Sequence, residues 1–454
     1  MAIATVNPAT GEQVRSFDPL TEGEIEEKLA KAAAAFRAYR KTSYADRAAL
    51  LHRAADILDD EAGELARLAT LEMGKTLGSA VAEVRKSALG CRWFADHGER
   101  MLADQPWPVE NGTAYTRYEP IGPVLAVMPW NFPYWQVFRF AAPALMAGDV
   151  GLLKHASNVP QVALAIEDVL RRAGFADGVF QTLLVPSSEI DGIIGDERVR
   201  AVTLTGSEPA GRAVGAAAGR HIKTSVLELG GSDAFIVMPS ADLEDAVANA
   251  VESRLLNNGQ SCINAKRFIV HADVFDEFLG RFADRMAALK LGDPMADGTD
   301  LGPLSSPDAV ETLHQQVTDT IAAGAKLHTG GKPLDGPGNY YPATVLSDIP
   351  DGSPGHHEEF FGPVALVWRA DSVDDAIRIA NDSPFGLGGS AWTTDAEEQR
   401  RFVTEVETGM LYVNKHTAST PEVPFGGAKN SGYGRELADF GPRTFTNAKT
   451  VWIA

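Results

Sequence analysis

The amino-acid sequence predicts an α/β protein with two lobes, each built on a mainly parallel sheet. Short apolar runs alternate with helical stretches between residues 122 and 237, a pattern typical of parallel strands joined by crossover helices. A second alternating set follows residue 262. The first hundred residues have mainly helical periodicity, so we expect helices that pack on a later sheet.

The N-terminal helices show a start signal and a buried face. Thr21 and Glu24 have the spacing of a capping box, and the apolar residues after them share one helical face: Ile25, Leu29, Ala32, Phe36 and Tyr39. Further along, Cys91 lies at helical spacing from Val84, Ala88 and Ala95. We therefore expect Cys91 to be a buried structural residue.

The expected strands form two series and a peripheral pair. The first series comprises residues 123–128, 150–153, 179–184, 201–205, 226–229 and 234–237; the second comprises 268–270, 364–367 and 410–413, with a helix over 372–380. Residues 113–118 alternate as a short strand, and residues 450–453 form an apolar strand that would otherwise be an exposed edge. This pair suggests an oligomerisation element.

Composition and charge exclude several classes of function. The 454 residues carry a formal net charge of -20, which argues against general affinity for nucleic acid or an anionic membrane surface, although a local basic pocket remains compatible with it. Two cysteines cannot build a disulfide framework, and the N-terminus lacks a secretory pattern, so we expect a cytoplasmic protein. The longest apolar stretch, residues 138–153, is too polar for a membrane span. We identify no metal site.

The segment from Asn257 to Cys262 predicts a reactive thiol. Two asparagines, a glycine and a glutamine give no apolar periodicity, so we expect Cys262 to be exposed and outside regular structure. Upstream, Glu228 ends an apolar run and is followed by a glycine pair. A thiol that attacks a carbonyl needs an oxyanion donor and a group that activates the water releasing the acyl product. We interpret Cys262 as the nucleophile and Glu228 as the base.

Small polar residues follow several strands, where parallel sheets bind ligands. Asn131 could donate to an oxyanion, or could belong to a proline-bounded turn. Lys154 follows one run, and Gly206 and Ser207 follow another at the head of a helix, which suits phosphate binding. The strict dinucleotide fingerprint is absent, so these residues alone leave nucleotide binding open.

Together these motifs resemble the aldehyde dehydrogenase superfamily over nearly the whole chain, most closely its short bacterial succinate-semialdehyde dehydrogenases. The motifs occur in the family's order, at residues 7–12, 129–133, 227–231, 259–262, 359–363 and 424–427, followed by Ser431-Gly432. The resemblance implies an aldehyde dehydrogenase-like fold. It divides the chain into a Rossmann-like cofactor-binding domain (1–100 and 121–230), an α/β catalytic domain (231–435) and an oligomerisation element (101–120 and 436–454) in a homodimer or homotetramer.

The resemblance also implies roles for the reactive residues. The Cys262 thiolate would attack an aldehyde, and the Asn131 amide and the Cys262 backbone N–H would hold the oxyanion. Hydride would pass to a nicotinamide, and Glu228 would activate the water that hydrolyses the thioester. The implied cofactor-binding residues are Trp130, Lys154, Ser157, Gly206, Ser207, Leu229, Glu359 and Phe361. A surface charge for Glu359 and core packing for Phe361 are the alternatives.

Ser157 predicts the choice of cofactor. Family members that prefer NAD commonly carry a glutamate three residues after the equivalent of Lys154, where it repels a 2′-phosphate. Serine removes that charge, and Lys154 supplies a cation. We therefore expect NADP to be preferred and NAD to be accepted less well. A serine that tolerates both cofactors is the alternative.

Arg139 predicts the choice of substrate. It lies about two helical turns after Asn131, where the resemblance puts the aldehyde entrance. A guanidinium suits an aldehyde with a distal carboxylate, so we expect oxidation of succinate semialdehyde to succinate. Gln136, Ser419 and Thr420 are expected beside it. A salt bridge within the helix layer is the alternative for Arg139.

Two further functions stay open. One is oxidation of another short aldehyde by the same chemistry. The other is a thiol esterase or acyltransferase that uses Cys262 without a redox step. The second would have no need of the cofactor residues Lys154, Ser207, Glu359 and Phe361.

Overall fold

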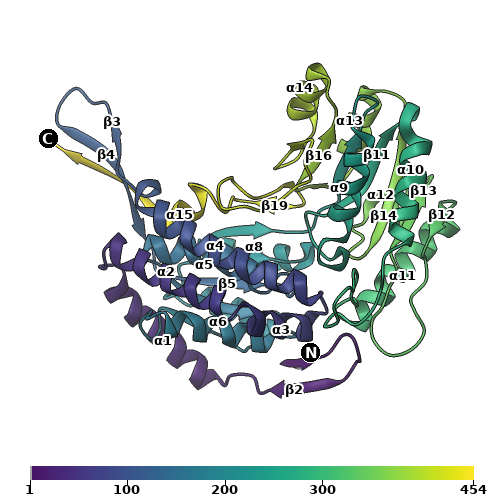
Figure 1. Ribbon diagram of the computed structural model, residues 1–454. Coiled ribbons are helices and arrows are strands. Elements are labelled where there is room, and N and C mark those ends of the chain that lie inside the picture. Colours follow the sequence, from purple (N-terminus) through teal and green to yellow (C-terminus); the bar gives the residue numbers. More distant parts are fainter. Residues whose placement is uncertain (1–2) are drawn as a thin grey trace.

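Two lobes, each containing one large sheet, make up the computed structural model, which describes residues 3–454 (Figure 1). The first sheet has the strand order β19-β9-β8-β5-β6-β7, and the second has the order β12-β13-β14-β11-β10-β16-β17. Helices connect most neighbouring parallel strands in both lobes. The prediction of a two-lobed α/β fold is therefore confirmed.

The first sheet reverses its strand order at β5. Its parallel strands are β5 (Pro123–Met128), β6 (Val150–His155), β7 (Phe180–Thr182), β8 (Ala201–Thr205) and β9 (Thr224–Glu228), with β19 (Gly432–Tyr433) added antiparallel to β9. The chain runs outward from β5 through β6 to β7, then returns to place β8 and β9 on the other side of β5. Such a switch point opens a crevice at the carboxyl ends of the strands.

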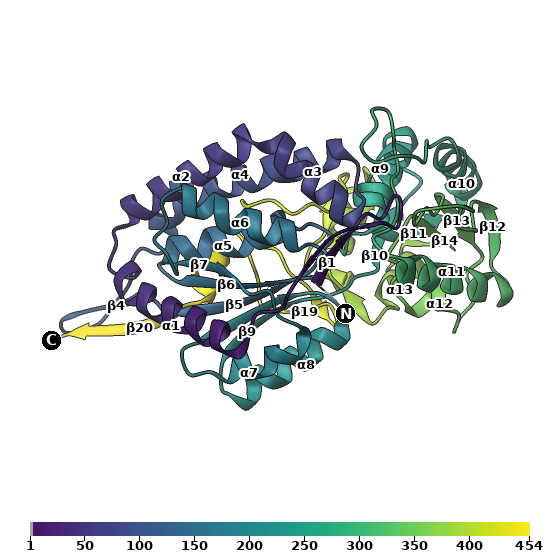
Figure 2. The same cartoon turned by 90° about the horizontal axis from the view of Figure 1, so that it is seen from below.

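Helices cover both faces of this sheet. The helices before β5 are α1 (Glu22–Tyr39), α2 (Tyr44–Asp60), α3 (Ala62–Met73) and α4 (Leu77–Met101). The helices after it in this lobe are α5 (Trp135–Ala147), α6 (Pro160–Arg172), η1 (Ser187–Glu189), α7 (Ile190–Gly195) and α8 (Glu208–Arg220). Figure 2 shows α4 and α5 on one side of the sheet and α7 and α8 on the other. The predicted capping box of Thr21 and Glu24 is present, and Cys91 is fully buried on α4.

The second lobe contains the predicted run 234–237, as β10 (Asp233–Val237). The other parallel strands are β11 (Ala265–His271), β13 (Thr344–Ser347), β14 (Val364–Ala370), β16 (Gly389–Trp392) and β17 (Tyr412–Val413), with β12 (Lys326–Thr329) antiparallel at the edge. The helices are α9 (Leu243–Leu255), η2 (Leu256–Gly259), α10 (Ala272–Ala287), α11 (Pro307–Ala322), α12 (Pro354–His357), α13 (Val373–Asn381) and α14 (Ala396–Glu405). Strands β13 and β16 were not predicted.

Smaller elements lie outside the two sheets. Strands β1 (Ile3–Val6) and β2 (Gln13–Phe17) form a hairpin, β15 (Phe385–Gly386) pairs with β18 (Ala428–Lys429), and α15 (Phe440–Thr444) leads into the last strand. An arm of β3 (Gln105–Trp107), β4 (Thr113–Pro120) and β20 (Thr446–Ile453) projects from the first lobe in Figures 1 and 2. The two predicted peripheral strands thus pair with each other within one chain.

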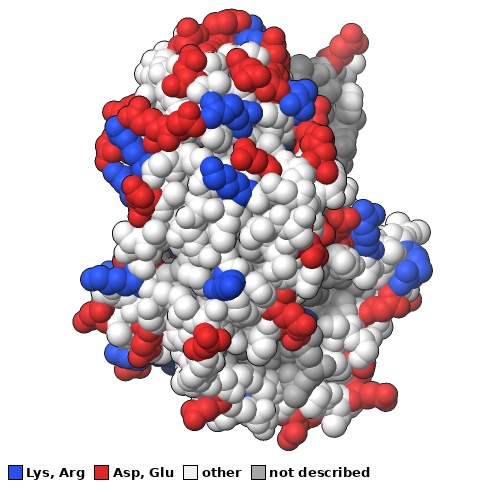
Figure 3. Space-filling model, turned by 90° about the vertical axis from the view of Figure 1, so that its right-hand side faces the viewer, with Lys and Arg blue, Asp and Glu red and all other residues white. Residues whose placement is uncertain are grey.

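The surface carries mixed charge. On the face shown in Figure 3, the described Lys and Arg side chains are scattered among Asp and Glu and form no continuous basic patch. Within the part of the chain that the structure describes, no helix combines the length and the apolar character needed to cross a membrane.

A buried ion pair connects α4 to the start of α5. The Lys75 ammonium pairs with Glu83, and both side chains are almost fully buried. The other carboxylate oxygen of Glu83 accepts the backbone N–H groups of Tyr134 and Trp135, at 2.8 and 3.0 Å. Because these N–H groups are at the buried start of a helix, where no carbonyl of the helix can accept them, Glu83 satisfies them and also stabilises the helix dipole. The pair therefore fixes the segment that carries Asn131.

Replacement of Lys75 by methionine should destabilise the fold by about 3–5 kcal/mol, because it leaves the Glu83 carboxylate buried without a counter-charge. The measurement is the midpoint of thermal unfolding. Lys41→Met, at an exposed position, is the control and should leave the midpoint unchanged. The double variant Lys75→Met/Glu83→Gln keeps an acceptor for the two N–H groups and should recover part of the loss. An unchanged midpoint for Lys75→Met alone would contradict the role of the pair.

Candidate functional site

The carboxyl ends of β5, β8 and β9 lie side by side. Val127 of β5 pairs with Leu204 of β8, and Thr205 of β8 pairs with Glu228 of β9. The residues that follow these strands therefore meet at one edge of the sheet. Asn131 follows β5, Gly206 and Ser207 follow β8, and Glu228 ends β9, so the sheet brings these predicted residues together.

The turn before Cys262 has an unusual backbone. Asn257, Asn258 and Gly259 have φ of 59°, 57° and 75°, all in the left-handed region that few residues other than glycine and asparagine adopt readily. Both asparagine side chains are buried and bonded. Asn257 Nδ2 donates to the carbonyl of Asn131 at 2.7 Å, and Asn258 Nδ2 donates to the carbonyls of Gly74 and Pro303 at 2.9 and 3.0 Å. The turn before Cys262 is thus irregular, as expected, and side-chain hydrogen bonds hold it in this conformation.

The Cys262 thiol is half-buried, where the sequence suggested an exposed one. It lines two cavities, as does Gln136, and we name each after the ligand that the sequence leads us to expect there. The aldehyde cavity is also lined by Arg139 and Ser419, and the nicotinamide cavity by Glu359 and Phe361. Burial raises the pKa of the Cys262 thiol to about 12, and the positive charges of Lys266 and Arg139 oppose the shift. A thiolate therefore needs help from these charges or from a ligand that changes the surroundings.

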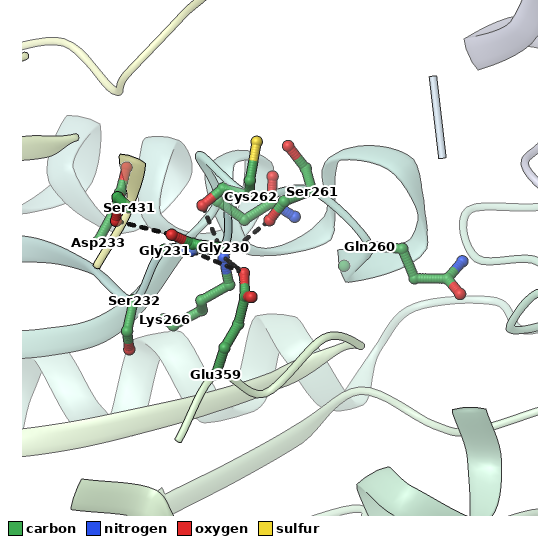
Figure 4. A network of polar contacts seen from close by, with 12 residues as sticks. Gly230, Gly231, Ser232, Asp233, Gln260, Ser261, Cys262, Lys266, Glu359 and Ser431 are labelled. Carbon is green, nitrogen blue, oxygen red and sulfur yellow. Dashed lines mark hydrogen bonds and ion pairs between the residues drawn. The ribbon is translucent and has the colours of Figure 1, made fainter. Parts of the chain in front are cut away.

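Lys266 lies under the backbone of the nucleophile. Its buried ammonium donates to the carbonyls of Ser261 and Cys262, both at 2.8 Å, and pairs with Glu359 at 2.9 Å. Figure 4 shows the Cys262 sulfur pointing away from this network. The ammonium therefore fixes the peptide groups beside Cys262 and leaves the sulfur facing the cavities. No sequence motif indicates this role, because Lys266 lies within a strand beside another cation, Arg267.

Asn131 has one amide hydrogen available for a ligand. Its Nδ2 donates to the carbonyl of Gln260 at 3.0 Å, and the residue lines the nicotinamide cavity next to Cys262. A side-chain amide carries two N–H donors, so the second can reach an oxyanion on an atom bonded to the Cys262 sulfur.

Glu228 lies in a buried cluster with Glu436 and Arg139. Neither carboxylate oxygen of Glu228 has a hydrogen-bond partner among the described residues. Arg139 Nε pairs with Glu436, and its Nη2 donates to Thr205 Oγ1 at 3.1 Å. Burial and, secondarily, the Glu436 charge hold the pKa of the Glu228 carboxyl well above its usual range, while Arg139 lowers it. Glu228 is not among the residues lining either cavity.

Arg139 therefore forms a buried salt bridge, but its partner Glu436 lies between β19 and α15 and not in the helix layer where the alternative put it. Arg139 also lines the aldehyde cavity. Ser419 lines the same cavity, and its hydroxyl accepts the Trp135 Nε1–H at 3.0 Å, which leaves the Ser419 O–H free to donate. Thr420 lines a separate surface cavity. Neither Glu436 nor Lys86, which also lines the aldehyde cavity, was predicted from the sequence, because neither lies in a motif at the end of a strand.

The nicotinamide cavity contains most of the predicted cofactor residues. It is lined by Trp130, Asn131, Gly206, Ser207, Leu229, Glu359 and Phe361, among others. The Trp130 and Phe361 rings meet edge to face with centroids 5.8 Å apart. Glu359 accepts the Gly231 N–H at 3.1 Å, and its carboxylate fills the space that a Cβ at residue 230 would need, which explains the glycine there.

The residues present fit a dinucleotide. Ser207 caps α8 with no side-chain cap hydrogen bond, so its hydroxyl and the helix N–H groups are available to a pyrophosphate. A neighbouring apolar cavity between α7 and α8 is lined by Lys154, Leu204, Val214, Ala217 and others, which suits an adenosine. Ser157 lies just beyond β6 and is half-buried; it is not among the residues lining these cavities.

Comparison with known proteins gives a consistent result. Residues 1–451 match the profile of the aldehyde dehydrogenase family. The chain is 58% identical over 457 residues to "Succinate-semialdehyde dehydrogenase [NADP(+)] 1" of Mycobacterium ulcerans, with 100% of each chain covered. It is 57% identical to "Succinate-semialdehyde dehydrogenase [NADP(+)]" of Mycobacterium avium, covering 100% of this chain and 97% of that one. The crystal structure of succinic semialdehyde dehydrogenase from Streptococcus pyogenes in complex with NADP+ superposes with a TM-score of 0.97 at 36% identity, with both chains fully covered.

Alkylation by iodoacetamide in the absence of ligands should modify Cys262 and spare Cys91, which is fully buried. Because the pKa of the Cys262 thiol is raised to about 12, the thiolate fraction should increase about tenfold per pH unit below that value. The alkylation rate should thus climb ~100-fold between pH 7 and pH 9. Peptide mass spectrometry measures the rate, with Cys91→Ser as the control. An alkylation rate that stops rising below pH 9 would contradict the raised pKa of the Cys262 thiol.

Proposed function

The chain belongs to the aldehyde dehydrogenase family, and from this premise we propose that it oxidises succinate semialdehyde to succinate with NADP as the preferred cofactor. The observation that carries the proposal is that two cavities meet at Cys262. One contains the predicted nicotinamide-binding side chains, and the other contains cationic and hydroxyl groups that suit an acidic aldehyde. The near full-length relatives and the structural neighbour with NADP+ support the choice of substrate and cofactor.

The Cys262 thiolate, formed by loss of the thiol proton to solvent, would attack the aldehyde carbon; a C–S bond forms as the C=O π bond breaks and leaves an oxyanion. The free N–H of Asn131 Nδ2 and the Cys262 backbone N–H would donate to that oxygen. NADP, when bound, supplies the hydride acceptor that turns this adduct into a thioester. The fixed position of the Cys262 peptide groups, held by Lys266, supports this geometry because oxyanion donors act best when they are rigid.

Glu228 would take a proton from the water that attacks the thioester. The products are the carboxylic acid and the free thiol, so the protein returns to its starting state. The raised pKa of Glu228 makes it a stronger base once it is ionised, but leaves it protonated at low pH. Hydrolysis of the thioester should therefore speed up as the pH rises through that pKa.

NADP preference is supported by the groups around the predicted adenosine site. Lys154 lines this cavity, and burial lowers the pKa of its ammonium, which a nearby phosphate would raise again. The one carboxylate among the lining residues, Asp191, is paired with Arg220. Residue 157 is serine, so no carboxylate at this position repels a 2′-phosphate.

The projecting arm supports a homodimer or homotetramer. Trp107, Trp452 and Ile453 are all exposed on its strands, and both β3 and β20 are edge strands. A second copy of the chain would cover these side chains. The two free thiols suit a reducing cytoplasm.

The purified protein should reduce NADP when it receives succinate semialdehyde, with a higher kcat/KM for NADP than for NAD. The measurement is reduced-nicotinamide absorbance with both cofactors, with butanal as an uncharged aldehyde of the same length. If the protein oxidises butanal but not succinate semialdehyde, it is an aldehyde dehydrogenase whose substrate differs from the one proposed. Thioester or ester hydrolysis without any cofactor reduction would favour the esterase interpretation.

Replacement of Glu228 by glutamine should separate the two halves of the reaction. The variant keeps the side-chain shape but has no base, so it should release about one equivalent of reduced cofactor per site in a burst and then nearly stop. Stopped-flow absorbance measures the burst, and intact-protein mass spectrometry detects the succinyl thioester. Cys262→Ser is the control and should give no burst. Steady turnover by Glu228→Gln at the wild-type rate would exclude Glu228 as the base.

A further inference from the structure

The loop of residues 129–133, which joins β5 to α5, carries two residues of the proposed site. Trp130 and Asn131 both line the nicotinamide cavity, and the Asn131 amide is the side-chain donor that we propose for the oxyanion. Pro129 and Pro133 have no backbone N–H, so the loop has few donors of its own. It therefore relies largely on hydrogen bonds from other parts of the fold.

His155 is buried against this loop. It is the last residue of β6 and pairs with Met128, the last residue of β5, in the parallel ladder. Its side chain is 5% exposed. The ring Nε2 lies 2.9 Å from the carbonyl oxygen of Pro133, and Nδ1 lies 3.0 Å from the backbone nitrogen of Ala156 and 3.2 Å from the carbonyl oxygen of Met128. One imidazole thus contacts the chain at both ends of the loop.

These contacts assign the hydrogen on the imidazole. Burial, and to a smaller extent the charge of Lys154, lowers the pKa of His155 to about 4, while the carbonyls of Pro133 and Met128 oppose the shift. The ring is therefore neutral at pH 7 and carries one N–H. Because the Ala156 N–H donates to Nδ1, that nitrogen is the acceptor. The hydrogen consequently lies on Nε2, which donates to the Pro133 carbonyl.

The Pro133 carbonyl needs this donor because it is buried at the start of α5. The backbone hydrogen bonds at this helix start run from Gln136 to Phe132 and from Phe138 to Tyr134. The Pro133 carbonyl lies between these two acceptors and receives the imidazole N–H. Without the imidazole, this end of the loop would have to move or leave a buried carbonyl unpaired, and both cost free energy.

The nucleophile's loop supports Asn131 from the other side. Asn257 Nδ2 donates to the Asn131 carbonyl at 2.7 Å, and Asn131 Nδ2 donates to the Gln260 carbonyl at 3.0 Å. Asn131 is thus held between the turn before Cys262 and the imidazole at the end of β6. Donors to an oxyanion act best when they are fixed before the reaction, so loss of either support should weaken the Asn131 amide as a donor.

We propose that His155 is a positioning residue whose imidazole holds the loop of residues 129–133, and with it the Asn131 amide, in the place that oxyanion stabilisation at Cys262 requires. The inference rests on the oxyanion role in the proposed function and adds β6 to the elements that build this site. The residue before it, Lys154, lines the adenosine cavity. The end of one strand then serves both the cofactor and the oxyanion.

The experiment measures kcat/KM for succinate semialdehyde oxidation with NADP and for hydrolysis of 4-nitrophenyl acetate without a cofactor. In the second reaction the Cys262 sulfur takes the acetyl group as 4-nitrophenolate leaves, and water then releases acetate. Both reactions form an oxyanion on a carbon bonded to this sulfur. The variants are His155→Phe, His155→Gln, Asn131→Ala and the double variant His155→Phe/Asn131→Ala.

Gln181→Leu is the matched control. Gln181 is buried on the neighbouring strand β7, and its Nε2 donates to the Lys28 carbonyl at 2.9 Å. It makes the same kind of bond as His155, but outside the loop. Gln181→Leu should therefore lower the midpoint of thermal unfolding and leave kcat/KM unchanged for both reactions.

His155→Phe should lower kcat/KM for both reactions by about 10-fold, since it misplaces an oxyanion donor that Asn131→Ala removes at a cost of about 100- to 1000-fold. His155→Gln keeps a side-chain N–H donor and should recover most of the rate. Added to Asn131→Ala, His155→Phe should change kcat/KM by less than about twofold, because no amide is left to position. If His155→Phe does not fold, His155→Asn takes its place, because its shorter amide does not reach the Pro133 carbonyl.

A His155→Phe variant that loses stability but keeps the wild-type kcat/KM, as expected of Gln181→Leu, would overturn the proposal. A loss that multiplies with that of Asn131→Ala would overturn it as well. If Asn131→Ala leaves both reactions unchanged, the oxyanion role and the positioning role are both wrong. If the ester is hydrolysed and NADP is not reduced, the proposed dehydrogenase activity is wrong, and the ester rates alone decide the role of His155.

Discussion

The left-handed turn at Asn257, Asn258 and Gly259 is the constraint on which the site depends. Asn257 bonds to the backbone of Asn131 in the first lobe, and Asn258 bonds to Gly74 in the first lobe and to Pro303 in the second. A turn of this kind is costly for most residues, so it persists only because buried hydrogen bonds hold it. These bonds connect the nucleophile's loop to both lobes. Cys262 consequently keeps a fixed position between the two cavities, each of which is lined by residues from both lobes.

Several buried charges around that loop form opposed pairs. Lys266 faces Glu359, Lys75 faces Glu83, and Arg139 faces Glu436. In a low-dielectric interior an unpaired charge is expensive, which explains why the pairs are held by additional hydrogen bonds to the backbone or to hydroxyls. Within residues 3–454, Arg254 is buried without a carboxylate partner, but it donates to the carbonyls of Gly259 and Ala265. Glu228 has neither an ion-pair partner nor a hydrogen-bond partner among the described residues.

Sequence patterns predicted the parallel strands best where an apolar run ends at proline or glycine, as at β5 and β8. They missed β16, because Gly389 and Ser390 weaken its apolar signal. They missed β13, because Thr344 and Ser347 at its ends leave an apolar run of only two residues. The turn carrying Cys262 was predicted, since polar residues there break periodicity. The pairing of Arg139 with Glu436 was not, because no local pattern connects residues so distant in sequence. Lys86 lies in a helical stretch whose charges resemble an ordinary solvated face.

The salt bridge between Arg139 and Glu436 also bears on how such an enzyme could be redesigned. A designer seeking new aldehydes would naturally change a cavity-lining arginine. Here that change would also remove the ion-pair partner of Glu436 and a positive charge that lowers the pKa of Glu228, so a gain in substrate range would be tied to a loss of turnover. Ser79 and Ala82 on the α4 wall of the cavity lie outside that cluster and can vary separately. Substrate range and turnover are therefore coupled at Arg139 and can be changed independently at these two positions.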